Sequence, residues 1–221
     1  MVRLRISEQA RASPGLFHAR SIGRFNERNS MTHQIRIGIM CGSLKKSSMN
    51  RKLAQFVGRQ LVKEGGVEID EIDLAALDLP LLSEDIDGLP DSVSRLKDQL
   101  IACDALIVAS PEYNGSMSGA LKNAIDWASI GRDGDEPLAC FKGKVCGLLS
   151  SSPGAIGGLQ GLVHVRQTLT RLQMLVVPAQ YALGGGHEAF NDNGDMKDEA
   201  KADMAVAVGR EMIRVCRALK A

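Results

Sequence analysis

Short, almost wholly apolar runs alternate with longer amphipathic segments along most of this chain. Four such runs are residues 35–40, 105–109, 145–149 and 174–177. A run of this kind predicts a strand that helices cover on both faces, because a strand with one wet face would alternate apolar and polar residues. We therefore expect these four strands to be central or well covered in a parallel sheet.

Residues 67–72 form a fifth run with a different pattern. Val67 and Ile69 alternate with acidic residues, which are Glu68, Asp70 and Glu71. Such alternation exposes one face of a strand, so this segment predicts an edge strand.

Five helical patterns accompany these strands, because apolar residues recur at three- and four-residue spacing. The predicted core faces are Leu53, Phe56, Val57 and Leu61; Val93, Leu96 and Leu100; Ala120, Leu121, Ala124 and Ile125; Leu162, Val165, Leu169 and Leu172; and Met204, Val208, Met212, Val215 and Leu219. Five strands alternating with five helices, with the second strand at an edge, predict an α/β fold with a doubly wound five-stranded parallel sheet in the order 2-1-3-4-5.

Composition excludes several classes of partner. The 221 residues include 27 basic and 26 acidic side chains, and only 4% are aromatic. We expect no nucleic-acid partner, because the chain offers neither a basic surface nor base-stacking rings. No segment approaches the roughly 20 apolar residues that cross a bilayer, so we expect no membrane partner.

The five cysteines are odd in number and show no Cys-x-x-Cys spacing; they are Cys41, Cys103, Cys140, Cys146 and Cys216. Most lie in apolar runs, where a thiol packs as a small apolar side chain. We expect reduced, buried thiols and a cytoplasmic protein.

Residues 1–30 differ from the rest of the chain because they hold six arginines and only two acidic residues. Three interpretations are open: a transit peptide, a disordered tail, or a mis-assigned extension before a true start at Met31. We favour the last two, because periodic fold signals begin directly after Met31. The predicted folded domain is 31–221.

The loop at residues 41–50 reads Cys-Gly-Ser-Leu-Lys-Lys-Ser-Ser-Met-Asn and joins the first predicted strand to the first helix. Hydroxyls, amides and two ammonium groups at a helix N-terminus predict a phosphate site. The alternative is a polar connecting loop that Ser48 or Asn50 caps. The common glycine-rich dinucleotide and nucleoside triphosphate loops are absent, which leaves a terminal phosphate monoester.

A rival interpretation is a low-molecular-weight phosphotyrosine phosphatase, in which a cysteine follows the first strand and an arginine stands at the sixth position after it. Here that position after Cys41 is Ser47, and the chain has no Asp-Pro pair to act as the general acid. Cys41 is therefore predicted to be a packed thiol.

A second loop, 110–116, follows the third predicted strand. With three other blocks it resembles the NADPH-dependent FMN reductase family, which includes quinone, chromate and azo-dye reductases. The blocks occur in the family's order and are Gly42-Ser43-Leu44-Lys45-x-x-Ser48-x-Asn50, Pro111-Glu112-Tyr113-Asn114, Leu121-Lys122-Asn123-Ala124-Ile125-Asp126-Trp127 and Ser151-x-x-Gly154-x-x-Gly157-Gly158.

This resemblance implies a flavodoxin-like fold and an NAD(P)H-dependent oxidoreductase that reduces quinones or other small acceptors by hydride transfer through bound FMN. The implied cofactors are FMN and NADPH or NADH, with no catalytic side chain and no metal. The implied FMN-binding residues are Ser43, Leu44, Lys45, Ser48, Met49 and Asn50 for the phosphate and ribityl end, Pro111, Glu112, Tyr113 and Asn114 along the ring, and Ser151 on the far side. The alternative is a flavodoxin-type electron carrier that binds FMN but does not itself oxidise NADPH.

The chain also departs from its relatives. Lys45 stands where many relatives have arginine, and it offers a point charge instead of a fork. Gln160 and Val163 stand where some chromate-reducing relatives carry an arginine and a tyrosine, so the acceptor cannot be copied over.

The oligomeric state is a further expectation. We expect a homodimer or homotetramer with the third predicted helix at the interface, because that helix carries Asn123 and the chain's one tryptophan, Trp127. The alternative is a monomer in which Trp127 caps the core.

Overall fold

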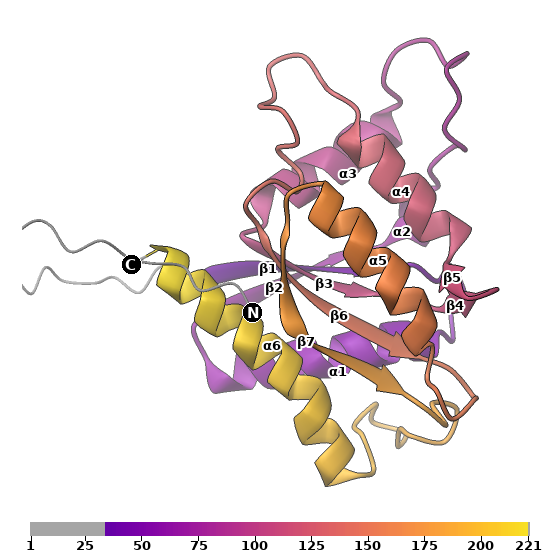
Figure 1. The fold of residues 1–221 in the computed structure, drawn as a ribbon, viewed down its shortest axis with the longest axis vertical. Coiled ribbons are helices and arrows are strands. Elements are labelled where there is room, and N and C mark those ends of the chain that lie inside the picture. Colours follow the sequence, from indigo (N-terminus) through magenta and orange to yellow (C-terminus); the bar gives the residue numbers. More distant parts are fainter. Residues whose placement is uncertain (1–33, 221) are drawn as a thin grey trace, which may run out of the picture. The chain divides into compact units, whose positions relative to one another are not determined.

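The computed structural model describes residues 34–220, so the expectation for residues 1–30 lies outside the described part. Its main sheet is parallel and has the strand order β2-β1-β3-β6-β7 (Figure 1). The strands are β1 (Ile35–Cys41), β2 (Val67–Ile72), β3 (Ala105–Ala109), β6 (Val145–Ser151) and β7 (Leu175–Leu183). Numbered among themselves, these strands confirm the predicted order 2-1-3-4-5.

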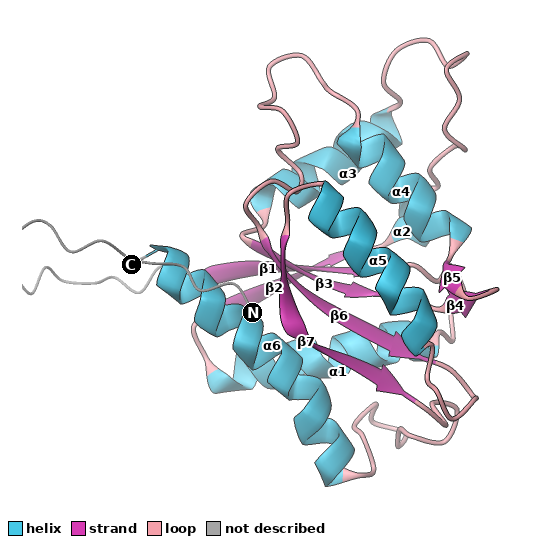
Figure 2. Ribbon diagram, viewed as in Figure 1, coloured by secondary structure: helices cyan, strands magenta, loops and turns pink. Residues whose placement is uncertain are grey.

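Helices cover both faces of this sheet, as Figure 2 shows. One face carries α1 (Met49–Glu64) and α6 (Glu199–Lys220), and the other carries α3 (Asp91–Ala102), α4 (Gly119–Ser129) and α5 (Leu159–Arg171). Each layer has its own apolar core against the sheet. Two small features were not predicted: the one-turn helix α2 (Leu74–Leu77), and a hairpin of β4 (Glu112–Tyr113) and β5 (Ser116–Met117).

Local sequence explains the ends of α1. Ser48 caps its N-terminus by accepting a hydrogen bond from the Arg51 amide at 3.2 Å. Gly65 ends it with a φ of 89°, and its amide donates to the carbonyls of Leu61 and Val62. The predicted core face of this helix is buried throughout.

The expectation that all four apolar runs are central or well covered is wrong for the last one. β7 is the second edge of the sheet, and its first residue, Leu175, is 46% exposed. The predicted strand order leaves the fifth strand without an outer neighbour, so apolar composition alone does not bury it. β3 and β6, in contrast, are buried at every residue.

Two predicted helix faces also need correction. Met204 and Leu219 of α6 are exposed, whereas Gly209 is buried. A Cβ on Gly209 would lie 2.5 Å from a methyl carbon of Leu61, so the absence of a side chain allows α6 to pack against α1. Leu172 lies just beyond the last residue of α5 and caps its C-terminus.

None of the helices in residues 34–220 is long and apolar enough to cross a membrane.

Candidate functional site

A pocket of about 170 Å³ lies at the carboxyl edge of the sheet, where the arrowheads of the strands point in Figure 1. The loops that follow β1, β3 and β6 form its walls. Its lining residues are Ser43, Lys45, Ser47, Ser48, Met49, Asn50, Pro111, Glu112, Tyr113, Ser151, Ser152 and Pro153. The structure therefore brings together three loops that are up to about a hundred residues apart in the chain.

Leu44 and Asn114 are the two predicted site residues that do not line this pocket. Leu44 is exposed to solvent, and Asn114 occupies the hairpin turn with a φ of 52°. Ser47, Ser152 and Pro153 line the pocket but were missed. The sequence could have indicated them only by their position beside predicted residues, since Ser152 and Pro153 directly follow Ser151.

The N-terminus of α1 gives the pocket a positive end. The amides of Met49 and Asn50 precede any intrahelical acceptor, and no other acceptor for them occurs among residues 34–220. The first turn carries no acidic residue. The buried Ser43 and Ser48 stand beside these amides, so the donor set fits an anion such as a phosphate group.

Asn50 connects two walls of the pocket. Its Nδ2 donates to the carbonyl of Ser151 at 2.9 Å, and its Oδ1 accepts from the Ser151 amide at 2.8 Å. Both residues are buried. The side chain of Asn50 thus fixes the end of β6 against the start of α1, a supporting role that spacing alone did not indicate.

Close backbone approach fixes the first loop against α4. A Cβ on Gly42 would lie 2.8 Å from both Ser118 Oγ and Leu121 Cβ. Ser118 Oγ donates to the Gly42 carbonyl at 2.5 Å and also accepts from the Leu121 amide as the N-cap of α4. Glycine is therefore required at the start of the loop that joins β1 to α1.

Trp127 and Asn123 serve the chain's own packing. Trp127 is 3% exposed, and its Nε1 donates to the Pro80 carbonyl at 2.7 Å. Asn123 binds the same carbonyl through Nδ2 and accepts from the Leu82 amide through Oδ1. Contrary to the expectation, Trp127 does not offer an exposed ring for an interface, because its indole is buried and hydrogen-bonded within the chain.

A glycine-rich segment supports the third wall. Ser151 Oγ donates to the Leu183 carbonyl at 3.2 Å, and the Gly186 amide donates to the Ser152 carbonyl at 3.0 Å. A Cβ on Gly186 would lie only 2.0 Å from Ser151 Oγ. This segment after β7 therefore holds the end of β6 in place and leaves no room for a side chain.

Cys41 lies beneath the first loop as a packed thiol. Its Sγ is 3.8 Å from Ser48 Oγ, and burial raises the pKa of the thiol. A raised pKa keeps the sulfur protonated near neutral pH, the opposite of what a nucleophilic cysteine needs. All five cysteines are buried free thiols, as expected.

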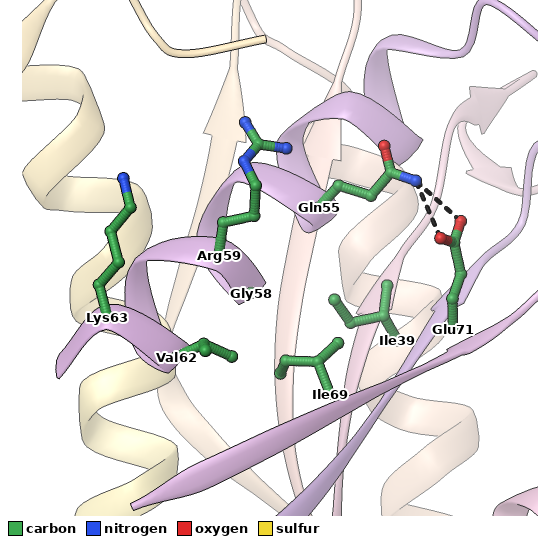
Figure 3. Close-up of a pocket in the computed structure, with 8 residues that line it drawn as sticks. All are labelled: Ile39, Gln55, Gly58, Arg59, Val62, Lys63, Ile69 and Glu71. Carbon is green, nitrogen blue, oxygen red and sulfur yellow. Dashed lines mark hydrogen bonds between the residues drawn. The ribbon is translucent and has the colours of Figure 1, made fainter. Parts of the chain in front are cut away.

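A larger hollow of about 640 Å³ lies between α1 and the edge strand β2 (Figure 3). Ile39, Ile69 and Val62 form its apolar part, and Gln55 donates to both carboxylate oxygens of Glu71 across one end. It contains no helix N-terminus and no hydroxyl group. Size alone therefore does not locate the chemistry, and the smaller pocket has the better donors for an anionic ligand.

Residues 35–188 match the family described as NADPH-dependent FMN reductase. The chain belongs to this family. A quinone reductase of Pseudomonas putida is 36% identical over 186 residues, which are 81% of this chain and 94% of that protein. An NAD(P)H-dependent FMN reductase of Pseudomonas aeruginosa is 34% identical over 178 residues, 79% of this chain and 91% of the relative.

A solved structure agrees with this membership. The flavoenzyme FerB of Paracoccus denitrificans, an NAD(P)H:(acceptor) oxidoreductase, superposes with a TM-score of 0.72 at 29% identity. The match covers 83% of this chain and 97% of FerB. The flavodoxin-like doubly wound architecture is thereby confirmed.

Proposed function

We propose that this FMN reductase family member is an NAD(P)H-dependent FMN oxidoreductase that reduces quinones or other small electron acceptors. The observation that carries this proposal is the meeting of unpaired α1 amides, buried serines and the Pro111–Tyr113 wall in one pocket. An anion-binding end beside an open wall suits a ligand with a phosphate at one end and a planar ring at the other.

We assign one part of the cofactor to each wall of the pocket. The amides of Met49 and Asn50, with Ser43 and Ser48, would hold the FMN phosphate. Pro111 and Tyr113 would lie along the ring, and Ser151 and Ser152 would close the opposite side. When bound, FMN supplies a ring that accepts hydride from NAD(P)H and delivers electrons to an acceptor.

The protein itself would position the acceptor at the mouth of the pocket. Tyr113 is 57% exposed at the mouth, where its ring can pack against a planar substrate. The exposed ring of Tyr113 beside Pro111 favours a flat, weakly hydrated acceptor such as a quinone over a small inorganic ion.

A Ser48→Asp variant tests the phosphate end without removing the cap. Aspartate is as good an N-cap as serine, and the comparison with riboflavin reports any general damage that the larger side chain does at this buried position. Its carboxylate would repel a phosphate at the α1 N-terminus. FMN affinity should therefore fall about tenfold or more, while riboflavin, which lacks the phosphate, should bind almost as before. Equal losses for both flavins would contradict the assignment.

The activity is tested on the purified chain with added FMN. Oxidation of NADPH without any protein partner, and its acceleration by a quinone, is the expected result. A chain that holds FMN but leaves it oxidised in excess NADPH would instead be a flavodoxin-type electron carrier.

We also propose a homodimer or homotetramer in a cytoplasmic location. The support for an interface is apolar exposure on α5, which lies beside α4: Leu159 and Val163 are exposed large apolar residues. The five free cysteines suit a reducing compartment. Light scattering at micromolar concentration tests the assembly, and the mass of one chain with full activity would contradict it.

A further inference from the structure

The β4–β5 hairpin holds Tyr113 at the mouth of the pocket. Its two-residue turn places Asn114 at a φ of 52° and Gly115 at 76°, the geometry of a tight hairpin turn. The hairpin has only two residues in each strand, so its own ladder cannot hold it rigid. Its position must depend on what it packs against.

The hairpin packs on the first turn of α5, where two glycines leave a flat surface. A Cβ on Gly161 would lie 3.1 Å from the Ser116 carbonyl oxygen and 3.2 Å from Glu112 Cβ. A Cβ on Gly158 would lie 3.5 Å from Glu112 Cβ. One turn further along α5, His164 Nδ1 is 2.9 Å from Ser116 Oγ.

The start of α5 has no cap of its own. Its N-cap is Gly158, which has no side chain to accept from the first-turn amides. Glu112, which belongs to β4, acts as the cap instead, because its Oε2 accepts from the Gly161 amide at 3.0 Å. A carboxylate at this end also complements the helix dipole. The bond therefore stabilises α5 and seats the hairpin at the same time.

We propose that Glu112 is a positioning residue of the reductase site: its carboxylate caps α5 and thereby holds Tyr113 and its turn at the mouth of the pocket. This differs from the direct contact with the flavin that the family resemblance implied for Glu112. The proposed effect on turnover rests on the proposed function, whereas the effect on the hairpin does not.

The experiment compares the wild type with Glu112→Gln, Glu112→Ala and Gly161→Ala in the full-length protein. Glutamine keeps an oxygen that can accept from the Gly161 amide, and alanine does not. The Gly161 variant leaves the carboxylate intact but pushes on the hairpin through the new Cβ. Glu136→Ala, a carboxylate removed from the exposed loop between α4 and β6, is the matched control.

Hydrogen exchange at residues 113–115 is read first, because it needs no cofactor. Loss of a side-chain cap should speed exchange there about tenfold in Glu112→Ala, and Glu112→Gln should stay within about threefold of the wild type. With FMN, NADPH and a quinone, kcat/KM should fall about tenfold in Glu112→Ala and be largely rescued by glutamine. Glu112→Ala and Gly161→Ala should not be additive, because both act on the same hairpin.

Three results would overturn the proposal. One is an unchanged hairpin in Glu112→Ala, and the second is additivity of the two alanine variants. The third is a Glu112→Gln variant as inactive as Glu112→Ala despite a protected hairpin, which would assign the carboxylate to direct contact with the cofactor or substrate. A wild type that neither binds FMN nor oxidises NADPH contradicts the proposed function instead, and the exchange measurement still decides the role of Glu112.

Discussion

Replacing Asn50 with alanine should weaken both the fold and the pocket. Its side chain makes two buried hydrogen bonds to the backbone of Ser151, at 2.9 and 2.8 Å. Removing them leaves an amide and a carbonyl of Ser151 without those partners in a buried position. A buried polar group left unpaired costs about 1–3 kcal/mol, so the free energy of unfolding should fall by about 2–4 kcal/mol.

The same change should loosen the junction between α1 and β6, which form two walls of the pocket. FMN affinity should therefore fall about tenfold, a free-energy change of about 1.4 kcal/mol. Urea unfolding measures the first quantity, and fluorescence quenching of FMN measures the second. Asn193→Ala is the matched control, because Asn193 is exposed, and it should change stability by less than about 0.5 kcal/mol.

An Asn50→Asp variant adds a pH dependence with a definite sign. An ionised carboxylate would face the Ser151 carbonyl without a proton to donate, so its folded-state pKa should rise above the unfolded value of about 3.9. Compared with the wild type at the same pH, the variant should therefore be most stable below about pH 4 and should lose stability as the pH rises through the folded-state pKa.

Two results would refute this role of Asn50. If Asn50→Ala unfolds like the wild type, the two hydrogen bonds do not hold the walls together. If it loses stability but binds FMN as tightly as before, the junction does not shape the pocket.

Three further predictions concern the rest of the molecule. Lys97→Met should lower the free energy of unfolding by about 2–3 kcal/mol, because the buried ammonium donates to two carbonyls at the far end of α4. FMN binding should not change, and loss of FMN binding at full stability would contradict this prediction. Burial raises the pKa of Cys146 from 9.0 to about 12. The stability gained by burying the neutral thiol is therefore complete below pH 9 and is lost toward pH 12. In urea unfolding, the free energy of unfolding of Cys146→Ala should decline less steeply over this pH range than that of the wild type. Gly42→Ala should cost about 1–3 kcal/mol, because its Cβ would crowd Ser118 and Leu121; a wild-type midpoint would show that the loop can shift freely.

Hydrophobic periodicity was sufficient to predict the sheet and its strand order. An apolar run or a helical repeat is a local property, and local patterns decide whether a segment forms a covered strand or an amphipathic helix. The bounds of β2 and β3 were predicted correctly for this reason. The exposure of β7 was not predicted, because exposure depends on which elements lie beyond the strand.

The pocket could be located from the sequence for a related reason. In a parallel sheet, every strand ends at the same edge as its neighbours, so the loops after β1 and β3 had to meet. The resemblance to the family then selected the residues in those loops. Ser152 and Pro153 were missed because the motif carried only Ser151 from that wall.

Only the tertiary structure decided which residues face the pocket and which support its walls. Asn50 and Ser151 are 101 residues apart, and Glu112 and Gly161 are 49 apart, so no spacing rule connects them. Each pair meets only after several strand and helix units have packed in register. The residue types in the sequence therefore determine which groups can bind a phosphate or cap a helix. Long-range packing determines which of these groups face the pocket and which hold its walls.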